Sequence, residues 1–269
     1  AASSLGIAFL PTTASIGIAA AFLLVFLRLV QGLSLGGESA AVGAYLAESA
    51  PARRRGLFTS VYPTTIMLGT LMGAMVGVAL TTFLSSDQLT SFGWRIPFVI
   101  GGLLGIVGFI IRRKSHETLD KTATPEPRPV RTVMKHHRSS IWVTFIIVGS
   151  AGLAFFGLVA GFPALAKASG QSGQLAFEAN TLALGLLVVL VPISAWVSDR
   201  VGRRTVLIVG YVGLAIASIA CMGLLASGSV VAAQLVLVVP TAMVQSVLMV
   251  TLIERFPSKL RGTGFGLCF

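Results

Sequence analysis

Charged residues are scarce in this sequence. Only 11% of its 269 residues are Asp, Glu, Lys or Arg, whereas about a quarter are charged in ordinary globular domains. Apolar residues make up 55%, and the mean hydropathy is +0.90. This composition excludes a soluble globular domain. It predicts an all-α membrane protein, because a helix satisfies its own backbone polar groups in lipid.

Residues that commonly carry chemistry are also few. The two cysteines, Cys221 and Cys268, fall in apolar stretches and are predicted to be small core side chains. The three histidines, His116, His136 and His137, lie in one basic segment without a pattern of metal ligands around them. The phosphate-binding pattern Gly-x-x-x-x-Gly-Lys-Ser/Thr does not occur in the sequence. We therefore expect no cofactor, no metal site and no use of ATP.

One short motif matches an enzyme pattern. Gly32-x-Ser34-x-Gly36 has the spacing of the nucleophile elbow of hydrolases. That elbow requires a turn between a strand and a helix, together with a histidine partner. Here the motif lies in the middle of an apolar stretch, and every histidine is in the basic segment. We expect the protein not to be an enzyme.

Long apolar runs predict seven complete transmembrane helices. A partial helix precedes them at 1–10 and another begins near 263, so we expect the chain to be a fragment of a longer protein. The complete helices are predicted at 18–48, 57–84, 94–111, 141–166, 177–198, 205–226 and 229–253.

The basic residues are concentrated between the predicted helices. The net charge is +11, and 17 of the 20 Lys and Arg residues lie in 53–55, 112–138, 200–204 and 255–261. By the positive-inside rule, these four segments face the cytoplasm. The charge therefore reports topology in a lipid bilayer and does not indicate a nucleic-acid partner. We expect a multi-pass protein of the plasma (inner) membrane.

A loop motif is repeated within the chain. Glu-x-x-Pro-x-x-x-Arg-Gly occurs at 48–56 and again at 254–262, which is 206 residues later (254 − 48 = 206). Such a duplication is typical of transporters built from two related bundles, here parallel repeats because both loops are predicted to be cytoplasmic. The predicted domains are part of an N-terminal helical bundle at 1–111, a cytoplasmic linker at 112–140 and part of a C-terminal bundle at 141–269.

The loop Asp199-Arg200-x-Gly202-Arg203-Arg204 resembles the signature loop of the major facilitator superfamily. Three further segments, at 28–38, 45–56 and 92–98, resemble the metabolite:proton symporter family within it. The resemblance implies an incomplete two-bundle helical transporter. Its expected activity is alternating-access proton symport of a small organic acid or zwitterionic osmolyte, by a monomer. The alternatives are a transport-inactive sensor or receptor of the same fold, and an uncoupled facilitator or efflux carrier.

Arg28 lies about 15 Å into its predicted helix, near the middle of the bilayer. An arginine there costs about 2.5–3.5 kcal/mol on insertion scales. We interpret Arg28 as a cation that binds a substrate carboxylate, helped by Gln31 on the same helical stripe. The 206-residue offset carries Arg28 onto Gln234, a second candidate for substrate binding. The alternative is that an internal acid such as Glu38 compensates Arg28, and that Gln234 merely bonds to a neighbouring helix.

Glu38 is the candidate for proton coupling. It lies one or two turns from the cytoplasmic end of its helix, where a half-buried carboxylate suits proton binding and release. A structural partnership with a basic loop residue is the other interpretation.

A third group of residues is predicted to form a cytoplasmic gate. The repeated acids close their helices beside the repeated arginines and the basic loop, and the resemblance implies that such residues latch two bundles together. The predicted gate residues are Glu48, Arg55, Asp199, Arg200, Arg203, Arg204, Glu254 and Arg261.

Overall fold

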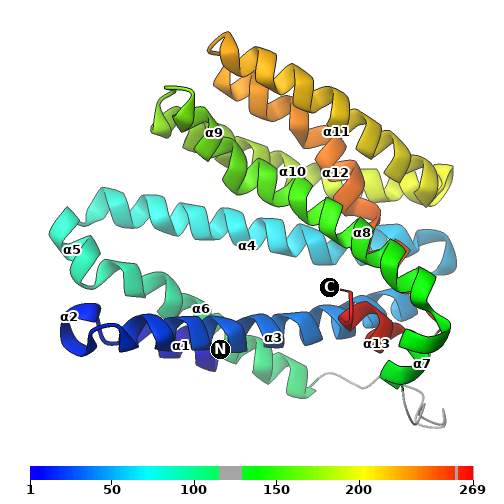
Figure 1. Cartoon of the computed structure of the whole chain (residues 1–269), viewed down its shortest axis with the longest axis horizontal. Helices are drawn as coiled ribbons and strands as arrows, with labels where there is room; N and C mark the ends of the chain where they lie inside the picture. The colour runs from blue at the N-terminus through cyan, green and yellow to red at the C-terminus, as the bar shows by residue number, and fades with distance from the viewer. Residues whose placement is uncertain (115–128, 258–259, 269) are drawn as a thin grey trace. The chain divides into compact units, whose positions relative to one another are not determined.

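The computed structural model describes residues 1–114, 129–257 and 260–268, and every regular element in these ranges is a helix (Figure 1). The elements are α1 (Ala2–Ala8), α2 (Thr13–Ile16), α3 (Ala19–Ser49), η1 (Ala52–Arg54), α4 (Arg55–Phe83), α5 (Ser86–Ser91), η2 (Gly93–Arg95), α6 (Ile96–Lys114), α7 (Pro129–His136), α8 (Arg138–Phe156), η3 (Gly157–Gly161), α9 (Phe162–Ala168), α10 (Gly173–Val201), α11 (Arg203–Ala226), α12 (Val230–Glu254) and α13 (Arg261–Gly266).

Seven helical segments in the described ranges are long and apolar enough to cross a membrane. The predicted all-α membrane fold is therefore confirmed, and each predicted span corresponds to one of these segments. They are Ala19–Ser49, Ala52–Phe83, Gly93–Ile111, Arg138–Ala168, Gly173–Val201, Arg203–Ala226 and Val230–Glu254.

The connection between the predicted spans 177–198 and 205–226 is a single residue long. Helix α10 ends at Val201 and α11 begins at Arg203, and Gly202 between them has a φ of +94°. Residues with a side chain rarely adopt that conformation, so glycine is required here. The Gly202 N–H donates to the Ser198 carbonyl at 3.0 Å, which completes the last turn of α10.

The contacts between residues divide the chain into two units. Unit 1 comprises 1–38 and 72–124, and unit 2 comprises 39–71 and 125–269, so the division falls inside α3 and α4. The predicted linker at 112–140 contains the end of α6, all of α7 and the start of α8, while residues 115–128 lie outside the described part. The division into two bundles and a linker stays a prediction.

In unit 1, helix α1 packs against α6. The backbone of α6 passes so close to Leu5 that a Cβ built on Gly102 would lie 2.5 Å from the Leu5 side chain. The start of α6 is held by Arg95, whose Nη2 donates to the Leu10 carbonyl at 3.2 Å. Leu27 of α3 contacts Gly6 of α1, so the N-terminal half of α3 packs against α1.

In unit 2, helix α12 is the central element and packs on both α10 and α11 (Figure 1). Of its most apolar window, 67% is buried, against 33% for α10 and 22% for α11. The closest approach between α11 and α12 is at Gly210, where an added Cβ would lie 2.9 Å from Val244 Cγ2 and 3.3 Å from the Val244 backbone nitrogen. Small residues allow this backbone contact, which is how membrane helices pack without a hydrophobic driving force.

We expect Gly210→Ala to destabilise the protein by about 1–3 kcal/mol, because the methyl group would overlap Val244 Cγ2 and crowd the Val244 backbone nitrogen, and a β-branched side chain in a helix has little freedom to turn aside. Gly223→Ala on the same helix is the matched control, since nothing lies within 4 Å of a Cβ there. That change should leave stability unchanged or raise it by up to about 1 kcal/mol, because alanine favours the helix. Apparent melting temperatures in one detergent compare the two variants, and equal values would contradict this packing.

Candidate functional site

The two copies of the repeated motif meet at one end of unit 2. Gly43 of α3 and Met249 of α12 occupy equivalent positions of the repeat (249 − 43 = 206). They touch, because a Cβ on Gly43 would lie 2.6 Å from Met249 Sδ. Ala47 and Ile253, which are also equivalent, lie in the same buried cluster as Met249. The C-terminal ends of α3 and α12 therefore lie side by side in unit 2.

Asp199 binds the N-terminus of helix α4. One carboxylate oxygen accepts a hydrogen bond from the Gly56 N–H at 2.8 Å, and the other accepts from the Leu57 N–H at 2.9 Å. The first N–H groups of a helix have no partner within the helix, and they carry its partial positive charge. The carboxylate satisfies two of them while only 6% of the side chain remains exposed.

Gly56 leaves the space that this contact needs. A Cβ at position 56 would lie 2.7 Å from Asp199 Oδ1 and 3.0 Å from Ser198 Oγ. Any side chain would therefore push α4 away from the end of α10. This steric requirement explains why the first Arg-Gly pair has a glycine at position 56.

Arg203 links two acidic residues, Asp199 of the loop and Glu254 of the second repeat copy. Its Nη1 lies 2.8 Å from Glu254 Oε2, and its Nη2 lies 3.8 Å from Asp199 Oδ1. The ends of α10, α11 and α12 are held together in this way. The Arg203 and Glu254 side chains are 28% and 31% exposed, so this pair contributes no more than about 1 kcal/mol.

Other predicted gate residues lie in different surroundings. The Arg200 guanidinium stacks on Trp196 one turn earlier in α10, with its carbon 3.7 Å from the ring centroid. Arg55 is half-buried, and its Nε has no hydrogen-bond partner within the described part of the chain. Neither residue is part of the Asp199 contacts described above.

Glu48, Arg204 and Arg261 are the remaining gate candidates. Glu48 and Arg204 are exposed. The side chain of Arg261 lies outside the described residues. The structure therefore brings together Asp199, Arg203 and Glu254, and the roles of the other candidates stay predictions.

In unit 1, Arg28 contacts neutral groups. Its Nη1 donates to Gln31 Oε1 at 3.2 Å, and its guanidinium carbon lies 5.3 Å from the centroid of the Phe98 ring on α6. Gln31 Nε2 in turn donates to Ser4 Oγ at 3.5 Å. No ion pair joins Arg28 to an acidic side chain in the described ranges. Glu38 is exposed and ten residues further along α3, about 15 Å away at 1.5 Å per residue.

Gln234 is fully buried inside unit 2. Its Nε2 donates to Asn180 Oδ1 on α10 at 2.8 Å and to the Leu158 carbonyl at 3.1 Å. Leu158 belongs to η3, a π-helical turn. Among the described residues, Gln234 Oε1 has no hydrogen-bond partner. These contacts match the alternative that Gln234 bonds to neighbouring helices, and its predicted role in substrate binding stays untested.

Sequence reasoning missed several partners in these contacts. Asn180 could have been noticed, because a polar amide inside a predicted span needs a partner. Phe98 lies in the segment 92–98 that resembles the symporter family, but the sequence did not suggest a function for it. The N–H groups of α4 belong to the backbone, so no residue type in the sequence marks them as partners. An acidic residue just before one helix and an Arg-Gly pair at the start of another nevertheless suggest a contact with a helix terminus. In the described ranges, no group of three or more His, Cys, Asp or Glu residues is placed to hold a metal ion.

The sequence matches the model of the Major Facilitator Superfamily along residues 1–269. The chain belongs to the major facilitator superfamily. It is 32% identical over 295 residues to the ectoine/proline transporter ProP of Corynebacterium glutamicum, covering 100% of this chain and 58% of that relative. It is 31% identical over 274 residues to the alpha-ketoglutarate permease of Escherichia coli, covering 99% of this chain and 63% of that relative. The chain thus spans less than two thirds of the length of these superfamily members.

We expect Asp199→Ala to lower stability more than Glu254→Ala. The first change leaves two N–H groups of α4 without their charged acceptor, a loss of about 2 kcal/mol or more. The second removes one partly exposed ion pair, worth less than about 1 kcal/mol. Apparent melting temperatures in the same detergent test this order. Asp87→Ala, at an exposed position of α5, controls for the loss of a carboxylate, and a larger effect at Glu254 would refute the assignment.

Proposed function

We propose that this chain is part of a secondary active transporter of the plasma (inner) membrane. It moves a small organic acid or a zwitterionic osmolyte by proton symport, through alternating access. The superfamily membership and the substrates after which the two relatives are named support this proposal. Ectoine, proline and alpha-ketoglutarate differ in net charge, but each carries a carboxylate.

The observation that carries the proposal is the meeting of the two repeat copies at one end of unit 2. Alternating access requires an end that closes in one state and opens in the other. Here the Asp199 contact with α4 and the Arg203–Glu254 pair close that end. The interactions are few and partly exposed, so their total strength is modest. Protonation and substrate binding elsewhere can therefore shift the balance between the two states.

Arg28 is the proposed carboxylate-binding residue, and its surroundings support that role. A guanidinium in a membrane-spanning helix is expensive unless it meets water or a partner. Its contacts here are the Gln31 amide and the Phe98 ring, and neither of these groups, which orient the side chain, carries a negative charge. Gln31 is proposed to assist by hydrogen bonding. Gln234 as a second binding residue and Glu38 as the proton carrier are further parts of this proposal.

Proteoliposomes containing the whole protein test the coupling. We expect uptake of radiolabelled proline, betaine or alpha-ketoglutarate to rise when the outside is made acidic and to fall when a protonophore collapses the gradient. Uptake that ignores the gradient would show an uncoupled facilitator. Binding of these compounds without any uptake would show a transport-inactive sensor.

We expect Arg28→Ala to lower the initial uptake rate about tenfold or more, because the substrate carboxylate would lose a charge-assisted hydrogen bond worth about 1.5 kcal/mol or more. Arg28→Lys should retain part of the activity, because the charge remains while the planar two-pronged donor is lost.

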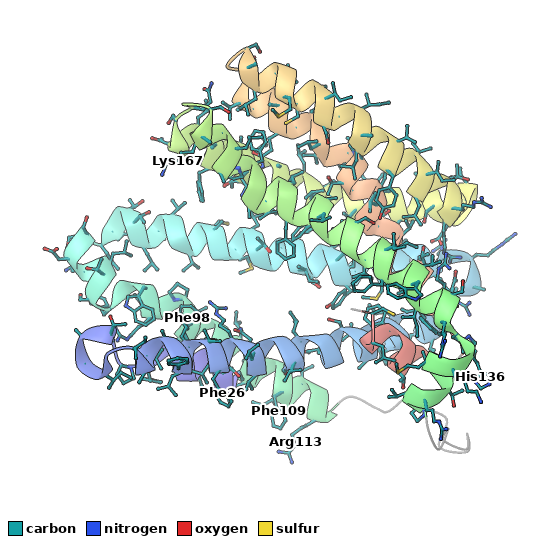
Figure 2. All side chains as sticks on the ribbon, in the orientation of Figure 1. Phe26, Phe98, Phe109, Arg113, His136 and Lys167 are labelled. Atoms are coloured by element: carbon teal, nitrogen blue, oxygen red, sulfur yellow. The ribbon has the colours of Figure 1, made fainter. Side chains whose placement is uncertain are left out.

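Arg113→Ala is the matched control for Arg28. Arg113 also lies over a phenylalanine of α6, 5.8 Å from the Phe109 centroid, but it is at the C-terminal end of that helix (Figure 2). Its loss should leave uptake close to the original rate. Normal transport by Arg28→Ala, with equal amounts of protein in the membrane, would remove Arg28 from the site.

A further inference from the structure

Helix α7 (Pro129–His136) packs through one side only. Val133 is fully buried in a cluster with Phe256. Val130 and Met134, one turn apart on the adjoining stripe, are 47% and 56% exposed. The helix is therefore docked on unit 2 and still presents apolar side chains outward.

Three cations lie beside these exposed apolar residues. Arg131 and Lys135 are one turn apart and share a face of α7. Arg138, at the start of α8, folds back toward them, because its Nε donates to the Met134 carbonyl at 3.0 Å. All three are exposed.

The cations and the apolar residues line one hollow of about 990 Å³. Among the described residues that line this hollow, three are basic and none is acidic. The lining consists of Pro129, Val130, Arg131, Met134, Lys135, Arg138, Ile141 and Trp142.

The hollow lies where a membrane-spanning segment begins. Trp142 is in the first turns of α8 and is 66% exposed, and such tryptophans are typical of the membrane–water boundary. Figure 2 shows His136 at the end of α7 and Lys167 beyond the far end of α8, at the end of α9. The hollow therefore belongs to the end that the basic residues predict to be cytoplasmic. A two-faced helix with a cationic side, placed at this level, has the character of an interfacial helix.

We propose that the hollow between α7 and the start of α8 binds an anionic phospholipid of the cytoplasmic leaflet. Arg131, Lys135 and Arg138 hold the phosphate of the headgroup through charge-assisted hydrogen bonds. Met134 and Trp142 lie against the upper part of an acyl chain. The choice of a lipid rests on the combination of three cations with exposed apolar side chains in one hollow. A soluble anion would use the cations and leave the apolar side chains without a partner.

Quenching of Trp142 fluorescence by brominated lipids tests this site. The sequence has three tryptophans, so Trp94→Phe and Trp196→Phe leave Trp142 as the reporter within it. We expect dibrominated phosphatidylglycerol, at low mole fraction in phosphatidylcholine vesicles, to quench Trp142 more strongly than dibrominated phosphatidylcholine does. Arg131→Gln with Lys135→Gln should reduce this preference about fivefold for each cation removed.

The control variant is Arg53→Gln with Arg54→Gln, which removes two exposed cations of η1 outside the hollow. It should keep the preference for phosphatidylglycerol, as should the charge-conserving Arg131→Lys with Lys135→Arg. Equal quenching by the two lipids in the original sequence would overturn the proposal. So would an equal loss in the Arg53 and Arg54 variant, which would show attraction by net charge alone. Displacement of phosphatidylglycerol by millimolar inorganic phosphate would point to a free anion and also overturn it.

Discussion

The positive end of helix α4 lies inside unit 2, and its N–H groups need an acceptor there. Asp199 supplies both oxygens, and this contact constrains everything around it. Gly56 has to lack a side chain, since a Cβ would overlap the carboxylate. The turn after α10 has to be short, so that Arg203 at the start of α11 can reach the same acid. The ends of four long helices, α4, α10, α11 and α12, thereby converge on one carboxylate.

Two kinds of interaction hold this end of the unit together, and they would respond differently to the opening that we propose. Beneath the polar contacts lies the apolar cluster that includes Ala47, Met249 and Phe265, whose packing has little directionality. The polar contacts are directional, and they lose strength steeply once the atoms separate. When the helix ends part, water can replace the apolar contacts gradually, whereas the N–H groups of α4 exchange one acceptor for another at once. This difference suits an end with two discrete arrangements.

Much of the fold could be predicted from the sequence, because lipid leaves few options for an apolar chain. Asp199, Arg203 and Glu254 were all among the predicted gate residues, but the sequence does not indicate which of the three arginines of the loop joins the two acids. Only the helix geometry places Arg200 on Trp196 and Arg203 beside both acids. For Gln234 the sequence offered bonding to a neighbouring helix as one alternative, but it did not identify Asn180 and Leu158 as the partners. The amphipathic pattern of α7 was present in the sequence, but the surrounding prolines and charges favoured a linker.

The contact between Gly43 and Met249 shows how the two related segments differ where they touch. The two positions are 206 residues apart, the offset of the repeated motif. Identical residues there would either leave a void, with two glycines, or collide, with two methionines. Helix α3 carries the smallest side chain and α12 a long flexible one. The volumes of the two side chains are therefore complementary, and neither segment could form this junction with a copy of itself.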